Sequence, residues 1–368
     1  MIETFIRGGL LSQNDQPTTE NPLLDLSGLP RFAEISAGQV EEALDAALAT
    51  SRAKIAAIET QCPTASWTSV ASELQDVEEY VERVWAPVSH LNAVRDTDKF
   101  RAAVEACLPK LSAFHSEVGQ NLSLFEGYRQ IADSDDFNAL SSARQKIVKN
   151  ALRDFRLSGA ELEGPDRERF REIVSELSTL CNQFDQNLMD ATDHWVLDIN
   201  SERDLEGLPQ SVVELARQTA NDASLDGWRF SLQAPSYIPF MMFCENRSLR
   251  QKMYEAYVTR ASDQGPDAGQ FDNGPLMVRI LRLRAEMASL LGFAHYAQYA
   301  LEGRMAGSAE EVSTFLRTLA DCAKAAGAKE LESLRHFALE EYGEEHLEAW
   351  DIAFYSEKLK QSLSLIHI

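Results

Sequence analysis

The stretch EGPDRERFREIVSELSTLCNQFDQNL, residues 163–188, decides the fold class because it carries a long and uninterrupted helical pattern. Glycine is typical of a helix end and proline of a first helical turn, so we expect one helix to end at Gly164 and the next to begin at Pro165. Apolar residues then recur every three or four positions, as on one face of a helix. They are Phe170, Ile173, Val174, Leu177, Cys181, Phe184 and Leu188. Such a stripe predicts packing between helices rather than a ligand-binding face.

Similar helix signals occur along much of the chain. Ser36–Gln39 and Ser308–Glu311 have the spacing of a capping box, in which two side chains satisfy backbone amides at a helix start. Asn273 and Pro275 mark another helix start, and Gly292 stands where that helix is expected to end. We therefore expect a mainly α-helical protein.

Two short segments have strand character instead. HWVLDI (residues 194–199) and WRFSLQ (residues 228–233) are rich in β-branched and aromatic residues, and they flank a short helical pattern at residues 212–219. We expect a small two-stranded β element near residues 194–233. The character of the sequence changes near residue 225, and we place a domain boundary there.

Composition restricts the classes of partner. The chain has 35 Lys and Arg against 58 Asp and Glu, a formal net charge of −23. Such an acidic surface repels phosphate backbones and anionic lipids, so we expect neither nucleic acid nor membrane as a partner. No apolar run approaches the roughly 20 residues that cross a bilayer, and the N-terminal stretch MIETFIRGGLLSQNDQ does not resemble a signal peptide. The five cysteines are widely spaced and odd in number, which indicates a reducing compartment. We expect a cytoplasmic protein.

The common catalytic motifs are missing from the sequence. It contains no GxGxxG, no GxxxxGK[ST] and no GxSxG. DSDDFNALSSAR, residues 133–144, begins like a calcium loop, but Asn138 and Arg144 replace the glycine and glutamate that such a loop needs. The histidines are His90, His115, His194, His295, His336, His346 and His367, and no two lie within one helical turn. Zinc ligands from distant positions remain open, but the residues alone assign no catalytic, substrate-binding or metal-binding side chain.

One long segment resembles a known family. PSYIPFMMFCENRSLRQKMYEAYVTRASDQGPDAGQFDN, residues 235–273, is similar to the start of the peptidase region in the thimet-oligopeptidase-like zinc metallopeptidases. ILRLRAEMASLLGFAHYAQYALEGRMAGSAEEVSTFL (residues 280–316) and AWDIAFYSEKLKQ (residues 349–361) resemble the blocks that follow it. NPLLDLSGLPRFAEI (residues 21–35) resembles the preceding helical domain of the bacterial members. The resemblance covers almost the whole chain in the expected order.

This resemblance implies a helical, clam-like, monomeric zinc metalloendopeptidase that hydrolyses short unstructured peptides in a narrow channel. In the family a HExxH helix and a later glutamate bind Zn²⁺, and the glutamate of the motif acts as general base on the zinc-bound water. That helix lies beyond the block that residues 349–361 resemble, and the sequence has no HExxH. We therefore expect no bound zinc and no activity of this chain alone. A non-catalytic helical protein that binds peptides or proteins is the alternative.

The same resemblance divides the chain. Residues 1–225 are expected to form the N-terminal helical domain, and residues 226–368 the beginning of a truncated peptidase domain. The last five residues, SLIHI at 364–368, match nothing expected of the family, and we interpret them as not native. Helices after about residue 276 carry apolar stripes for partners outside the chain, so we expect exposed apolar patches and self-association.

Several residues keep two interpretations. Trp350, Asp351 and Tyr355 either line the channel of an intact enzyme or serve packing and helix capping. Arg284 and Glu286 are candidates for ion pairs with helices that this chain does not contain. The loop QGPDAG, residues 264–269, is either mobile near the cleft or an ordinary connection between helices.

Overall fold

The computed structural model describes residues 21–95 and 97–363. The chain divides into two compact units, Met1–Glu161 (unit 1) and Leu162–Ile368 (unit 2), and each is described by itself. α-Helices dominate the described residues, which confirms the predicted mainly α fold. The predicted boundary at residue 225 concerns where the peptidase domain starts, and it stays a prediction.

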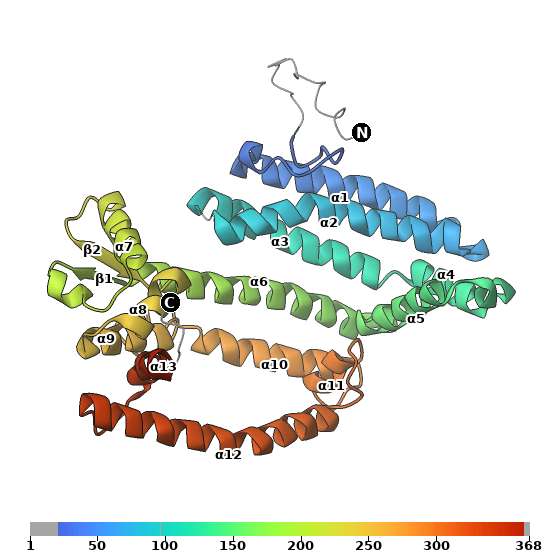
Figure 1. Cartoon of the computed structure of the whole chain (residues 1–368). Helices are drawn as coiled ribbons and strands as arrows, with labels where there is room; N and C mark the ends of the chain where they lie inside the picture. The colour runs from blue at the N-terminus through green and yellow to red at the C-terminus, as the bar shows by residue number, and fades with distance from the viewer. Residues whose placement is uncertain (1–20, 96, 364–368) are drawn as a thin grey trace, which may run out of the picture. The chain divides into compact units, whose positions relative to one another are not determined.

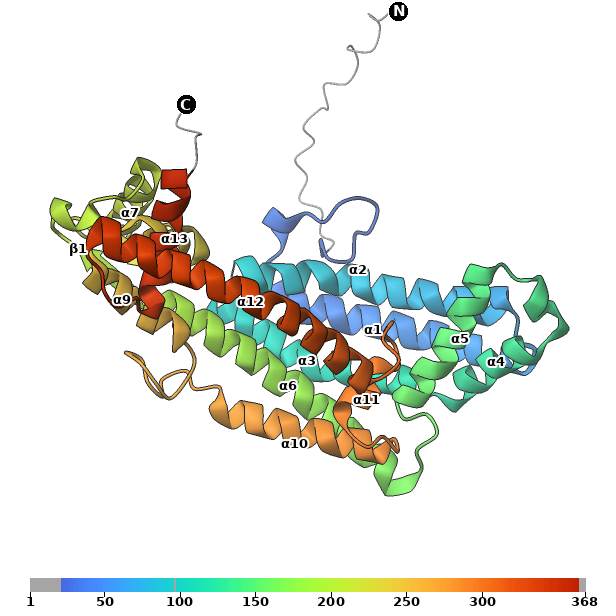
Figure 2. The same ribbon diagram turned by 60° about the horizontal axis from the view of Figure 1, so that its bottom comes forward.

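Unit 1 is a bundle of helices. α1, α2 and α3 run side by side, and α4 packs against α5 and the end of α1 (Figures 1 and 2). Ser36 precedes α1, and its backbone amide donates to Gln39 Oε1 at 2.8 Å, as the capping spacing predicted. The helices are α1 (Ala37–Glu59), α2 (Glu73–Val94), α3 (Asp98–Gly119), α4 (Leu122–Asp133) and α5 (Ser142–Leu157).

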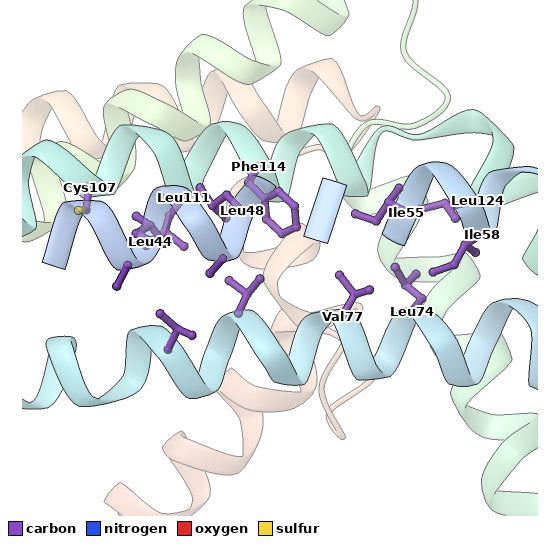
Figure 3. Close-up of a cluster of buried hydrophobic side chains, with 14 of the residues drawn as sticks. Leu44, Leu48, Ile55, Ile58, Leu74, Val77, Cys107, Leu111, Phe114 and Leu124 are labelled. Atoms are coloured by element: carbon purple, nitrogen blue, oxygen red, sulfur yellow. The ribbon is translucent and has the colours of Figure 1, made fainter. Parts of the chain in front are cut away.

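One continuous cluster of buried apolar residues joins all five helices of unit 1. Figure 3 shows Leu44 and Leu48 of α1 beside Leu111 of α3, with Val77 of α2 on the opposite side of the same cluster. Leu124 of α4 is fully buried in it. Each fully buried aliphatic side chain of this kind contributes about 1.5–3 kcal/mol relative to exposure to water. This cluster holds unit 1 together.

Unit 2 combines eight of the labelled helices with a small sheet. β1 (Val196–Ile199) and β2 (Trp228–Ser231) pair in antiparallel register, with Val196 opposite Ser231 and Ile199 opposite Trp228. The predicted β element and the helix between its strands are thereby confirmed. The helices are α6 (Gly164–His194), α7 (Gln210–Asp222), α8 (Ala234–Phe243), α9 (Arg247–Val258), α10 (Gly274–Leu290), α11 (Tyr296–Leu301), α12 (Ala309–Tyr342) and α13 (Ala349–Leu363).

Most predicted helix ends are observed, and one is wrong. Ser308 Oγ accepts from the backbone amide of Glu311 at 3.0 Å and begins α12. Gly292 follows α10 with a φ of 80°, as expected. Gly164, however, is the first residue of α6 and does not end α5. α5 already ends at Leu157, and Gly159 (φ 80°) supplies the left-handed residue that reverses the chain there.

The buried apolar residues of unit 2 form three separate clusters. The first joins α6 and α10 through Phe170, Ile173, Leu283 and Met287. The second lies between the sheet and helices α7, α8 and α9, and the third lies between α12 and α13. Their members include Phe230, Phe240 and Met253 in the second, and Leu334, Phe354 and Tyr355 in the third.

α12 leaves much of its length uncovered. Residues 313–330 are all exposed, including the apolar side chains of Phe315, Leu316 and Leu319. Only Leu334 and Ala338 of this helix are buried. The apolar stripe expected after residue 276 is therefore exposed along α12.

Candidate functional site

The three residues with two interpretations, Trp350, Asp351 and Tyr355, all lie on α13. This helix packs against α8, α9 and α12 within unit 2 (Figure 1). The side chain of Asp351 is completely buried. A buried carboxylate is costly unless charged or polar partners satisfy it, so its partners decide what it does.

Two arginines of α9 surround Asp351. Arg247 donates through Nε to both carboxylate oxygens at 3.0 Å and through Nη2 to Oδ2 at 2.5 Å. Arg250, itself 1% exposed, donates from Nη2 to Oδ1 at 2.9 Å and from Nη1 to the carbonyl oxygen of Cys244 at 2.7 Å. The backbone amide of Glu348 donates to Oδ2 at 3.0 Å. We call Arg247, Arg250 and Asp351 the buried ionic cluster.

This cluster fixes Asp351 in its charged form. Burial alone raises the pKa of Asp351, but hydrogen bonds from Arg247, the Glu348 amide and Arg250 outweigh burial and leave the pKa below its usual value. The amide of Glu348 lies just before the first turn of α13, so Asp351 also caps that helix. Asp351 therefore anchors α13 to α9, in agreement with the interpretation as a packing and capping residue.

Trp350 and Tyr355 pack in the same region. The ring of Trp350 meets that of Tyr254 edge-on, with centroids 6.2 Å apart. Tyr355 is buried and its ring lies 5.4 Å from that of Tyr342 on α12. Burial raises the pKa of Tyr355, so its hydroxyl stays neutral over the physiological range.

Arg284 and Glu286 have partners within the chain. Glu286 accepts from Arg169 of α6 at 2.6 Å from Nε and 2.9 Å from Nη2, and Arg169 also bonds Glu172. The guanidinium of Arg284 lies 5.0 Å from the ring centre of Tyr296. Glu286 thus has an ion-pair partner inside the chain, and that partner lies 117 positions earlier, too far for any local pattern to show.

The QGPDAG loop connects α9 to α10 and is closed by its own backbone. The amide of Gly269 donates to the carbonyl oxygen of Ser262, and that of Asn273 to Ala261, both at 3.0 Å. The Asn273 side chain also bonds Asn187 and the carbonyl oxygen of Phe184, which ties the end of the loop to α6. These bonds favour the interpretation as an ordinary connection.

The described residues do not form a metal site. Across residues 21–95 and 97–363, no three His, Cys, Asp or Glu side chains form a group that could hold a metal ion. His295 caps α11, and His336 Nε2 lies 3.3 Å from Glu340 of the same helix. His367 lies outside the described residues. The zinc ion implied by the family thus has no matching ligand set here, and no catalytic step can be derived through it.

No helix of the described residues is both long enough and apolar enough to cross a bilayer. Of the cysteines, Cys62, Cys107 and Cys244 are buried, and all five are free. Burial raises the pKa of both Cys107 and Cys244 to about 11, so these thiols are not poised as nucleophiles.

The sequence interpretation missed Arg247 and Arg250 as the partners of Asp351. The only local signal is their spacing of three within NRSLRQKM, residues 246–253, which places them on one helix face. That spacing is common on solvated helices, and nothing in it indicates burial. The partner carboxylate lies about a hundred residues away, so only the fold identifies the cluster.

Comparison with known proteins identifies two regions of the chain. Residues 240–367 match peptidase family M3, and residues 44–167 match the neurolysin/thimet oligopeptidase N-terminal domain. The buried ionic cluster lies inside the first of these regions. The two matched regions lie in the order in which the sequence resemblance placed them.

Several relatives match over nearly the whole chain. Oligopeptidase A of Haemophilus influenzae is 43% identical over 347 residues, which are 94% of this chain and 51% of that protein. Oligopeptidase A of Escherichia coli is 43% identical over 93% of this chain and 50% of its own length. A probable cytosolic oligopeptidase A of Arabidopsis thaliana is 33% identical over 95% of this chain and 50% of its own. The chain spans about half the length of the curated relatives it matches, and it belongs to peptidase family M3.

Proposed function

We propose that this chain is one half of a cytoplasmic zinc metalloendopeptidase that hydrolyses short, unstructured peptides. The observation that supports this most is the match of residues 240–367 to peptidase family M3, together with relatives named oligopeptidase A. In this proposal the residues that hold Zn²⁺ and activate water lie in the part of the relatives' length that this chain does not span. The 368 residues alone are then inactive, and the intact enzyme works as a monomer.

The role of this half is to build and brace one part of the peptidase. The buried ionic cluster ties α13 to α9, and the paired arginines Arg169 and Arg279 tie α6 to α10 through Glu286 and Glu176. Rigid helices of this kind hold the elements of a site within the small tolerance that catalysis needs.

A chimera tests the proposed activity. Residues 1–363 of this chain would be joined to the remaining half of the Escherichia coli relative, and both chimera and native chain assayed with a quenched fluorogenic peptide. We expect cleavage by the chimera that a zinc chelator abolishes, and none by the 368-residue chain. A chimera that is folded by circular dichroism and binds zinc, yet cleaves nothing, would contradict the proposal.

The alternative is a non-catalytic helical protein that binds peptides or proteins. The exposed apolar face of α12 is compatible with it, because uncovered patches of this kind commonly mark interaction surfaces. Under this alternative the nucleotide sequence beyond the codon for Ile368 lacks an HExxH-encoding continuation. Finding that continuation in frame would exclude it.

A further inference from the structure

A groove of about 790 Å³ lies entirely within unit 1, between α2, α3 and α5, with α4 at its floor. Its volume falls in the range of roughly 300–1,000 Å³ that is usual for ligand pockets. Apolar side chains form much of its wall, among them Leu74, Val77, Phe114 and Phe155. The groove therefore has the volume and the apolar wall of a ligand pocket.

The charged residues that line the groove are acidic, apart from one histidine. Glu78, Glu79 and Glu82 line it from α2, and Asp154 from α5. No Lys or Arg lines it, although Arg153 bonds Asp154 from outside with Nε 2.8 Å from Oδ1. Glu78, Glu79 and Glu82 have no ion pair among the residues that the structure describes. Like charges one helical turn apart, as at Glu78 and Glu82, destabilise a helix unless a cation offsets them.

A buried tyrosine also lines this groove. Tyr128 of α4 is 3% exposed and is one of the lining residues. A hydroxyl group at the wall of a groove is normally satisfied by protein, water or ligand. Burial raises the pKa of Tyr128, and the charge of Glu78 adds to this effect.

The charge of a second carboxylate, that of Asp154, acts on Glu78. The side chain of Glu78 is accessible to solvent, but the surrounding walls limit hydration, and this burial raises its pKa, with a further contribution from Asp154. His115 lines the same groove, and burial lowers the pKa of its imidazole, so it adds no positive charge at neutral pH. Among the residues that line the groove, no cation meets Glu78, Glu79 or Glu82, whereas Asp154 already has Arg153 as a partner.

We propose that this groove binds a basic peptide segment. In this arrangement the aliphatic stem of a lysine or arginine lies on the apolar wall, as long basic side chains commonly do. Its ammonium or guanidinium group meets Glu78, Glu82 and Asp154, and the Tyr128 hydroxyl donates to a backbone carbonyl oxygen of the peptide. The site is a binding site, independent of the zinc chemistry proposed above.

Fluorescence anisotropy tests this binding on the full 368-residue chain. The probe is a fluorescein-labelled pentapeptide with lysine and arginine among alanine and leucine, and the matched control peptide has glutamate at both basic positions. We expect the basic peptide to bind and the acidic one not to bind. Equal binding of the two peptides would overturn the proposal. So would displacement of the basic peptide by spermidine at lower concentration than by unlabelled peptide, which would indicate a free polyamine as occupant.

Matched variants locate the binding. Glu78→Gln should raise the Kd of the basic peptide about fivefold, the usual size of one partly solvated charge-assisted bond. Tyr128→Phe should raise the Kd of the basic peptide about threefold. Asp76→Asn is the control, because it removes a carboxylate charge from α2 outside the groove, and it should raise this Kd less than twofold. Thermal unfolding verifies that each variant is folded. Unchanged Kd in Glu78→Gln, or an equal loss in Asp76→Asn, would show that binding is not in this groove.

Because the readout is binding without cleavage, its failure leaves the proposed peptidase activity untouched. Failure of the chimera to cleave would equally leave this proposal standing.

Discussion

Units 1 and 2 are both helical, yet they bury their apolar residues differently. In unit 1 a single cluster joins α1 to α5, so every helix is covered by neighbours of the same unit. In unit 2 the buried residues fall into three clusters, and residues 313–330 of α12 belong to none of them. Helical periodicity is equally clear in both. It therefore predicts a helix and its apolar face, but not whether anything covers that face.

The two units also differ in how charge is used. Unit 1 has its acidic groove, whose carboxylates largely face solvent. Unit 2 instead buries Asp351 between two arginines and makes α13 depend on that ionic cluster. A unit with a continuous apolar core should tolerate the loss of any one charge, whereas a unit built from small clusters should not.

The largest effect is expected from Asp351→Asn. It leaves the guanidinium of Arg250 buried without its carboxylate, and the loss of one partner from a buried ion pair costs about 3–5 kcal/mol. Native-state hydrogen exchange should show this loss as faster opening of α9 and α13. Asp198→Asn is the control, because the Asp198–Arg229 pair of the same unit is partly exposed and contributes about 0.2–1 kcal/mol. Equal losses in both variants would show that burial is not the deciding factor.

The next effect is expected in the core of unit 1. Leu124→Ala removes a fully buried side chain and should cost about 2–5 kcal/mol. Since one cluster joins the five helices, amides throughout α1–α5 should lose protection together. Leu319→Ala on α12 removes the same atoms from a half-exposed side chain, and should change the free energy of unfolding by about 0.5 kcal/mol or less. A cost above 2 kcal/mol at Leu319 would contradict the contrast between the units.

Local features of the fold were predictable, and long-range ones were not. The starts of α1, α10 and α12 follow from capping residues and proline, whose effects act within one helical turn. The β pair follows from two alternating segments close in sequence. The misplaced end at Gly164 shows the limit of such signals, because glycine is also tolerated at a helix start. Asp351 with Arg250, and Glu286 with Arg169, join residues about a hundred positions apart, and no periodicity records such a pairing.

A smaller effect concerns pH. The pKa of Asp351 is lowered in the folded state, so its stabilising contribution is complete above the unfolded value of about 3.9 and is lost as pH falls through the folded value. The stability difference between the native chain and Asp351→Asn should therefore be constant from about pH 5 to 8 and shrink below about pH 4. Urea unfolding across this range measures it. A difference that shrinks towards alkaline pH instead would mean that a different group is responsible.

The smallest effect on stability, but a clear one on association, is expected on α12. Phe315 and Leu319 lie four positions apart on one face of the helix, and both are more than half exposed. The double variant Phe315→Ser, Leu319→Ser removes exposed apolar area, so self-association should weaken. The free energy of unfolding should change by about 1 kcal/mol or less. Sedimentation velocity over a concentration series measures the change.

Val258→Ser, which alters an exposed residue at the end of α9, serves as control. If both variants associate as the native chain does, the uncovered face of α12 is not what distinguishes unit 2 from unit 1, and its three small clusters must account for the contrast alone.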